Sequence, residues 1–114
     1  MVRRLSDRIH IEIDARIRKT NEKADCFIKN ISEEYISLET SPRGTDIDLS
    51  TSARLYLEFE TPSGEFLSLP CSVFWSKKAS SESLITTFCL KIEEKYSEYE
   101  DMYKDLFSGN EGIF

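Results

Sequence analysis

Four side chains in two short segments are suited to binding a small phosphorylated ligand. Arg4 and Arg8 lie four residues apart in "RLSDR", and Asn30 and Ser32 lie two apart in "NIS". Residues four apart are neighbours on a helix and even spacings share a face of an extended chain, so each pair projects in one direction. The arginine guanidinium is a planar fork for phosphate oxygens or guanine acceptors and also stacks on bases. Asparagine and serine supply short groups that can read a base edge or orient the arginines.

The same side chains also allow a purely structural interpretation. The chain has 21 acidic and 15 basic residues, so Arg4 and Arg8 can pair with surplus carboxylates. Asn30 and Ser32 are common turn residues, because their side chains hydrogen-bond to nearby backbone groups. These residues by themselves favour the structural interpretation over ligand binding.

The rest of the chain offers few groups for catalysis or metal binding. His10 is the one histidine, and it lies on the outward side of the first predicted strand. The sequence pattern places no cysteine or serine nucleophile next to it. The cysteines, Cys26, Cys71 and Cys89, lie in apolar stretches and lack C-x-x-C spacing. They are interpreted as small buried side chains. The sequence predicts neither an enzyme, nor a metal site, nor a cofactor.

Length, charge and hydropathy limit the classes of function. The 114 residues suffice for one domain with a modest core. A net charge of −6 argues against DNA or RNA as a partner, because that affinity comes largely from neutralising phosphates. The sequence has no long apolar run and no apolar signal segment after "MVRRLSDR", which predicts a cytoplasmic protein without membrane insertion.

Alternating apolar residues predict the strands that would position the candidate side chains. In "IHIEIDARIR", residues 9–18, apolar residues face one way and polar residues the other, as in a half-buried antiparallel strand. Further strands are predicted at 26–32, 35–40, 53–59, 66–75 and 84–92. The inward face of the strand at 66–75 is assigned to Leu67, Leu69, Cys71, Val73 and Trp75.

After the last strand, the apolar spacing changes to three and four residues. This spacing predicts an amphipathic helix over 93–107. The polar segment 41–52 is predicted to be a long loop with a role in function. About six short strands and one helix predict an all-β fold with a terminal helix, a small antiparallel barrel or sandwich. The single domain 1–114 is divided into an N-terminal arginine arm at 1–8, a barrel at 9–92 and the helix.

The two motifs and their order resemble the PilZ family, the bacterial receptor domains for the second messenger cyclic di-GMP. That family carries an R-x-x-x-R segment before its first strand, matched here by Arg4 and Arg8, and a D/N-x-S-x-x-G segment after its second, matched by Asn30 and Ser32. "CSVFWSKK" is similar to the family's strand ending in an aromatic residue, and "FCLKI" to its closing strand. The resemblance covers residues 4–107 and implies a six-stranded antiparallel β-barrel.

The resemblance implies that Arg4 and Arg8 grip the phosphates and contact the guanines of cyclic di-GMP, while Asn30 and Ser32 contact the ligand on the barrel surface. The domain would then be a sensor that changes its conformation, or the surface shown to a protein partner or a second copy, when the nucleotide binds.

One departure from the family pattern lies in the second motif. Tyr35 stands where the family usually has glycine, and Glu34 precedes it. The tyrosine ring would either block a base or stack on it, which makes Tyr35 a further candidate ligand contact, and Glu34 adds negative charge. The alternative function is therefore a degenerate PilZ-like protein-interaction module that no longer binds the nucleotide, working through the tyrosine-rich helix or the loop at 41–52.

Overall fold

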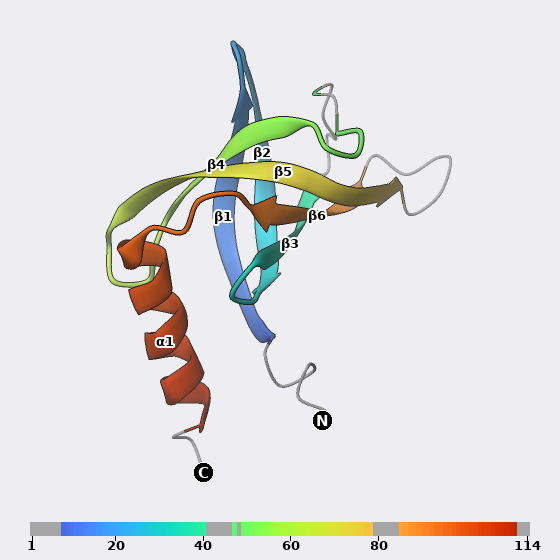
Figure 1. Cartoon of the computed structure of the whole chain (residues 1–114). Helices are drawn as coiled ribbons and strands as arrows, with labels where there is room; N and C mark the ends of the chain where they lie inside the picture. Colours follow the sequence, from blue (N-terminus) through green and yellow to red (C-terminus); the bar gives the residue numbers. More distant parts are fainter. Residues whose placement is uncertain (1–7, 41–46, 48, 79–84, 112–114) are drawn as a thin grey trace.

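The computed structural model describes residues 8–40, 47, 49–78 and 85–111, with the side chains of 78 and 108–111 left out of the description. Within these residues, six antiparallel strands close into a barrel in the order β1-β2-β3-β6-β5-β4 (Figure 1). The strands are β1 (Ile9–Lys19), β2 (Glu22–Ile31), β3 (Tyr35–Thr40), β4 (Arg54–Glu60), β5 (Phe66–Lys78) and β6 (Thr86–Ile92). The predicted six-stranded barrel with a C-terminal helix is confirmed.

The barrel core follows from the alternation of apolar residues along the strands. In β4, Leu55, Leu57 and Phe59 are buried, while the residues between them lie at the surface or are half-buried. Every strand contributes apolar residues to the core, although in β3 and β6 the intervening Ser37 and Cys89 are buried as well. Fully buried core side chains include Ile17, Ile28, Ile36, Leu38, Leu57, Leu69, Phe88 and Leu90. Side chains of successive strand residues point to opposite faces, so each strand also presents a second row to the outside of the barrel.

A β-bulge in β5 changes which residues face outward. Val73 pairs with Leu90 of β6, and Trp75 pairs with the preceding β6 residue, Cys89, so Phe74 is an extra residue between the two pairs. A bulge shifts the alternation downstream of it. Trp75 is therefore 42% exposed, and its predicted place on the inward face was wrong. Similar register shifts occur between His10 and Ile13 in β1 and in β2 just before Asn30.

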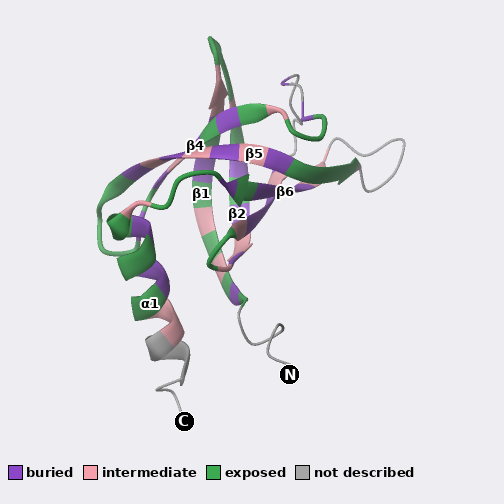
Figure 2. Ribbon diagram, in the orientation of Figure 1, coloured by how far each residue is buried: buried purple, intermediate pink, exposed green. Residues whose placement is uncertain are grey.

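The C-terminal helix α1 (Ser97–Glu111) lies at one end of the barrel, beside the start of β1 (Figure 1). Its buried face carries Tyr99, Met102 and Tyr103 and is turned toward the barrel (Figure 2). The helix begins later and ends later than the predicted 93–107. The backbone N–H of Glu93 donates to the carbonyl of Pro70 at 2.8 Å, which ties the chain after β6 to the barrel and delays the first helical turn.

The predicted loop at 41–52 and both ends of the chain lie largely outside the described residues. Of that loop, Ile47 and Leu49 are buried in the core, and the Leu49 carbonyl accepts a hydrogen bond from the Ser76 hydroxyl at 3.0 Å. Arg4 and most of the segment 1–8 also fall outside the described part. No helix in the described residues is long and apolar enough to cross a membrane.

The three cysteines are free and buried. Burial raises the pKa of the Cys26 and Cys71 thiols to about 12, so both remain protonated. Among the described residues, no group of three or more His, Cys, Asp or Glu side chains could hold a metal ion.

Candidate functional site

A row of polar and aromatic side chains crosses the outward side of five neighbouring strands. Strand pairing places His10 of β1 beside Asn30 of β2, and Asn30 beside Ser37 of β3. Ser37 pairs with Cys89 of β6, which pairs with Trp75 of β5. Adjacent strands lie about 4.8 Å apart, so these five residues form one line over the barrel. Ser37 and Cys89 in the middle of the line are buried, so His10, Asn30 and Trp75 on either side of them form its accessible part. We call this surface the outer row.

Three register shifts decide which residues stand in the outer row. The bulge before Asn30 turns its side chain outward, although Ile28 and Ile31 on either side are fully buried. The bulge in β5 does the same for Trp75. Because a bulge is a local departure from the period of two, counting alternate residues in the sequence does not locate it.

Arg8 carries its positive charge to this same face. Arg8 is exposed and directly precedes β1. Burial raises the pKa of the Cys89 thiol, while a hydrogen bond with Ser37 and the positive charge of Arg8 act in the opposite direction. The positive charge of Arg8 therefore acts on the pKa of Cys89, which lies three strands away in the barrel order. Arg8 and Asn30, two of the residues predicted to contact a ligand, thus lie toward the same face of the barrel.

Ser32 lies at the end of this face, in the turn between β2 and β3. Its N–H donates to the carbonyl of Tyr35 at 2.8 Å, and the N–H of Tyr35 donates to its hydroxyl oxygen at 3.1 Å. The Ser32 hydroxyl in turn donates to the Tyr35 carbonyl at 3.1 Å. These bonds close a tight turn around Glu33 and Glu34, here called the β2–β3 turn. The hydroxyl of Ser32 thus shapes the turn, whereas Asn30 stands on the strand surface.

The ring of Tyr35 lies against Phe74 at the edge of the outer row. Tyr35 pairs with Lys91 of β6, and its ring centroid is 5.0 Å from that of Phe74, with the planes tilted by 51°. Phe74 is the extra residue of the β5 bulge and precedes Trp75 in the chain. Tilted aromatic pairs at this separation attract each other beyond their simple burial. Three aromatic rings therefore border a surface otherwise made of polar side chains, a composition suited to stacking bases.

The carboxylate of Glu34 is paired on the side of the turn facing the helix. Its Oε2 lies 3.8 Å from the ammonium Nζ of Lys95, and both side chains are partly exposed. The ion pair offsets part of the negative charge that the sequence places beside Tyr35. An exposed pair of this kind contributes little to stability, about 0–1 kcal/mol, but it affects the local field.

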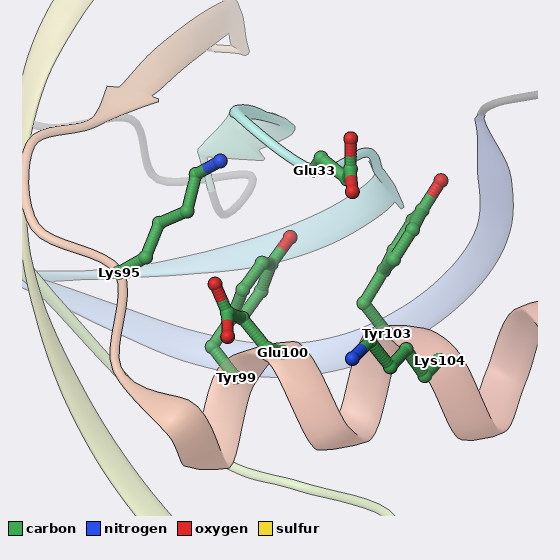
Figure 3. Close-up of a pocket in the computed structure, with 6 residues that line it drawn as sticks. All are labelled: Glu33, Lys95, Tyr99, Glu100, Tyr103 and Lys104. Carbon is green, nitrogen blue, oxygen red and sulfur yellow. The ribbon is translucent and has the colours of Figure 1, made fainter.

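A small open cavity lies between the β2–β3 turn and α1 (Figure 3). Its volume is about 170 Å³, and it is lined by Glu33, Lys95, Tyr99, Glu100, Tyr103 and Lys104. Two carboxylates and two ammonium groups line it, so it has no net charge to select an anion or a cation. The outer row, with Arg8 and three aromatic rings, is the stronger candidate for a nucleotide.

Comparisons with known proteins agree with this architecture. The family model of the PilZ domain matches residues 2–100. No curated protein sequence matches the chain significantly. The structure of the Bacillus subtilis inhibitor of motility MotI/DgrA aligns with a TM-score of 0.76 at 15% identity, covering 99% of this chain and 54% of that one. The chain thus spans about half the length of MotI/DgrA.

A second solved structure has a length close to that of this chain. The PilZ domain of CeSA from a cellulose-synthesizing bacterium aligns with a TM-score of 0.62 at 15% identity, covering 91% of this chain and 97% of that domain. At such low identity the two structural likenesses concern the fold alone. The match to the family model covers most of the sequence, including the arginine and Asn-x-Ser segments.

Proposed function

This chain belongs to the PilZ domain family, and from that premise we propose that it is a regulatory domain that binds cyclic di-GMP across the outer row. PilZ domains are regulatory binding domains and are generally receptors for this nucleotide. The observation that supports the proposal is the meeting of Arg8, Asn30 and Trp75 on one outer face, although they come from three separate parts of the chain. Sites that accept a nucleotide combine cationic forks with stacking surfaces in this way.

Each group on the face has a role that follows from its chemistry. Arg8, with Arg4 from the segment outside the description, would hold the two phosphates and the guanine acceptor edges through charge-assisted hydrogen bonds. Asn30 would offer both a donor and an acceptor to a base edge. Trp75 would stack on a guanine, and Ser32 would hold the turn that places Tyr35 at the edge of the face. Binding would change the surface shown to a protein partner or to a second copy of the chain.

Titration calorimetry tests the proposal directly. We expect saturable binding of cyclic di-GMP and none of cyclic di-AMP at the same concentration, since the two ligands share phosphates and differ in their base edges. A thermal-shift assay should agree, because a ligand that binds only the folded state raises its stability by about 2.7 kcal/mol at a hundredfold excess over Kd. No heat and no saturation at tens of micromolar cyclic di-GMP would show that the sensor function is wrong.

Trp75 supplies a spectroscopic readout of the same site. It is the one tryptophan of the chain and is 42% exposed. We expect cyclic di-GMP to quench its fluorescence, because a stacked guanine replaces water at the indole face. Trp75→Ala should weaken binding by about fivefold or more, since base–aromatic stacking contributes about 1–3 kcal/mol. The matched control is Phe66→Ala, which removes an exposed aromatic near the start of the same strand. Equal affinities of both variants would exclude stacking on Trp75.

Tyr35 distinguishes a working site from a degenerate one. Its ring packs on Phe74 at the edge of the outer row. We expect Tyr35→Gly to weaken cyclic di-GMP binding several-fold in titration calorimetry, because the aromatic border is lost, and Tyr35→Phe to bind like the wild type. Failure of the wild type to bind, with binding gained in Tyr35→Gly, would instead identify a degenerate interaction module whose site the ring blocks.

A further inference from the structure

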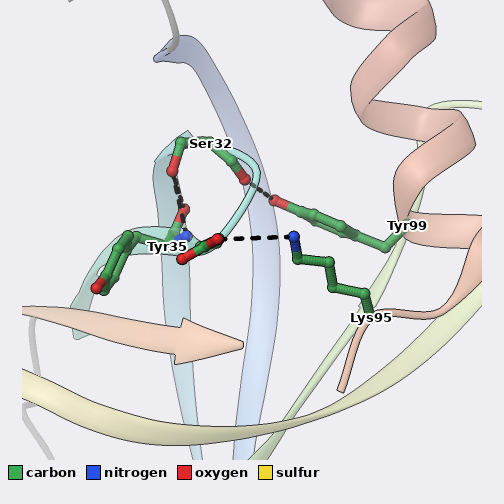
Figure 4. A network of polar contacts seen from close by, with 5 residues as sticks. Ser32, Tyr35, Lys95 and Tyr99 are labelled. Atoms are coloured by element: carbon green, nitrogen blue, oxygen red, sulfur yellow. Dashed lines mark hydrogen bonds and ion pairs between the residues drawn. The ribbon is translucent and has the colours of Figure 1, made fainter. Parts of the chain in front are cut away.

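We infer that Tyr99 of α1 is a positioning residue for the nucleotide site: through the β2–β3 turn, it couples the docking of α1 to ligand binding on the outer row. The inference rests on the proposed function and adds to it a specific regulatory contact. It follows from how the turn is held on its two sides. Figure 4 shows the side chains of Tyr35 and Tyr99 on opposite sides of the turn.

The turn is a short, rigid element between the ligand face and the helix. The three hydrogen bonds between Ser32 and Tyr35 leave it few conformations. Tyr35 extends from the turn toward Phe74 and the outer row. A displacement of the turn therefore moves the ring of Tyr35 relative to Phe74, and with it the aromatic border of the site.

Tyr99 holds the other side of this turn with a hydrogen bond from the helix. Its hydroxyl donates to the backbone carbonyl of Ser32 at 2.6 Å (Figure 4). The side chain is 1% exposed, so the carbonyl bond is shielded from water. Burial raises the pKa of the Tyr99 hydroxyl well above its usual range, so the group stays protonated and remains a donor at physiological pH.

The last residue of β6 and the segment that joins β6 to α1 add two more links to the turn. The backbone N–H of Ile92 donates to the carbonyl of Glu34 at 2.9 Å, and Lys95 pairs with the Glu34 carboxylate at 3.8 Å. Three polar contacts thus reach two of the four turn residues, Ser32 and Glu34. The cavity beside Glu33 separates the rest of the helix surface from the turn (Figure 3), so the contact depends on directed polar bonds more than on packing.

These links make the coupling reciprocal. If the docked helix stabilises the turn conformation that fits the nucleotide, then the bound nucleotide must stabilise the docked helix by the same free energy. The buried face of α1, with Met102 and Tyr103, is the surface whose exposure would change with ligand. Binding of the nucleotide on the outer row would in this way change how firmly α1 is docked on the other side of the turn.

Tyr99→Phe tests the inference, because it removes the hydroxyl and keeps the ring. One neutral hydrogen bond contributes about 1 kcal/mol, so we expect cyclic di-GMP affinity to fall about five-fold in titration calorimetry. In the wild type, cyclic di-GMP should also slow amide hydrogen exchange in residues 97–107, and this protection should be lost in Tyr99→Phe. The matched control is Tyr96→Phe, which removes a hydroxyl located near Tyr56 of β4 rather than near the turn.

The outcomes separate this inference from the proposed function. Binding by the wild type, with weakened binding and lost helix protection in Tyr99→Phe alone, supports the coupling. Equal affinity and equal protection in the wild type and both variants overturn the coupling and leave the binding function standing. Absence of binding by the wild type overturns the proposed function, and the coupling with it.

Discussion

We expect Arg8→Ala to lower the affinity for cyclic di-GMP by at least about a hundredfold, so that titration calorimetry no longer detects binding. Each charge-assisted hydrogen bond contributes roughly 1.5–3 kcal/mol, and an arginine fork makes two toward a phosphate. Every 1.4 kcal/mol changes Kd about tenfold, so two lost bonds account for the expected change. Arg8 is placed for this role because it is exposed directly before β1, and its positive charge acts to lower the pKa of the Cys89 thiol in the middle of the outer row.

The same variant should leave the stability of the fold almost unchanged. Arg8 is exposed and precedes β1, so it contributes little to the core. Surface substitutions of this kind usually change the free energy of unfolding by less than about 0.5 kcal/mol. Urea denaturation of Arg8→Ala and of the wild type checks this expectation and separates a lost ligand contact from a lost fold.

Arg16→Ala provides the matched control for charge. Arg16 lies on β1, the strand that follows Arg8, roughly 25 Å further along at the rise of an extended chain. Its guanidinium pairs loosely with Asp25 at 3.6 Å, with both side chains exposed. The control should bind cyclic di-GMP like the wild type. If both arginine variants lose affinity equally, the net charge of the domain, and not a contact by Arg8, governs binding.

Phe88→Ala is the substitution with the largest expected effect on stability. Phe88 of β6 is fully buried, and it faces the core directly before Cys89 of the outer row. Removing a buried phenyl ring costs about 3–5 kcal/mol, through lost transfer free energy and the cavity left behind. Domains of this size have only about 5–15 kcal/mol of stability, so a large share of the variant's stability would be lost.

Urea denaturation followed by circular dichroism measures this effect. Phe66→Ala is the matched control, because it makes the same chemical change at a side chain that is 68% exposed. We expect its free energy of unfolding to stay within about 0.5 kcal/mol of the wild type. Equal losses in the two variants would contradict the assignment of Phe88 to the inner face, and with it the outward position of Cys89.

Most strands of the fold could be predicted from the sequence, because alternation of apolar and polar residues survives wherever a strand is regular. In β4 the predicted inward residues Leu55, Leu57 and Phe59 are the buried ones. The order of the two motifs within this pattern identified the family, and the family model confirmed it. The start of α1 was predicted too early, because the hydrogen bond from the N–H of Glu93 to the carbonyl of Pro70 ties the residue after β6 to the barrel.

The candidate site was only partly accessible from sequence. Arg8 and Asn30 were named from their types and spacing, and the structure brings them to one face. Their role toward a ligand, like that of Arg4, Ser32 and Tyr35, stays a prediction. Trp75 was assigned to the core, since a bulge breaks the period of two without leaving a sequence signature.

The sequence by itself determined the element types, the apolar faces and the motif residues, since these depend on neighbours a few positions apart. Only the tertiary structure decided that Asn30, Cys89 and Trp75 stand in one row and that Tyr99 reaches the carbonyl of Ser32. The physical reason is register. Strand pairing and bulges set which distant residues become neighbours, and they depend on the closing of the whole barrel rather than on any local stretch.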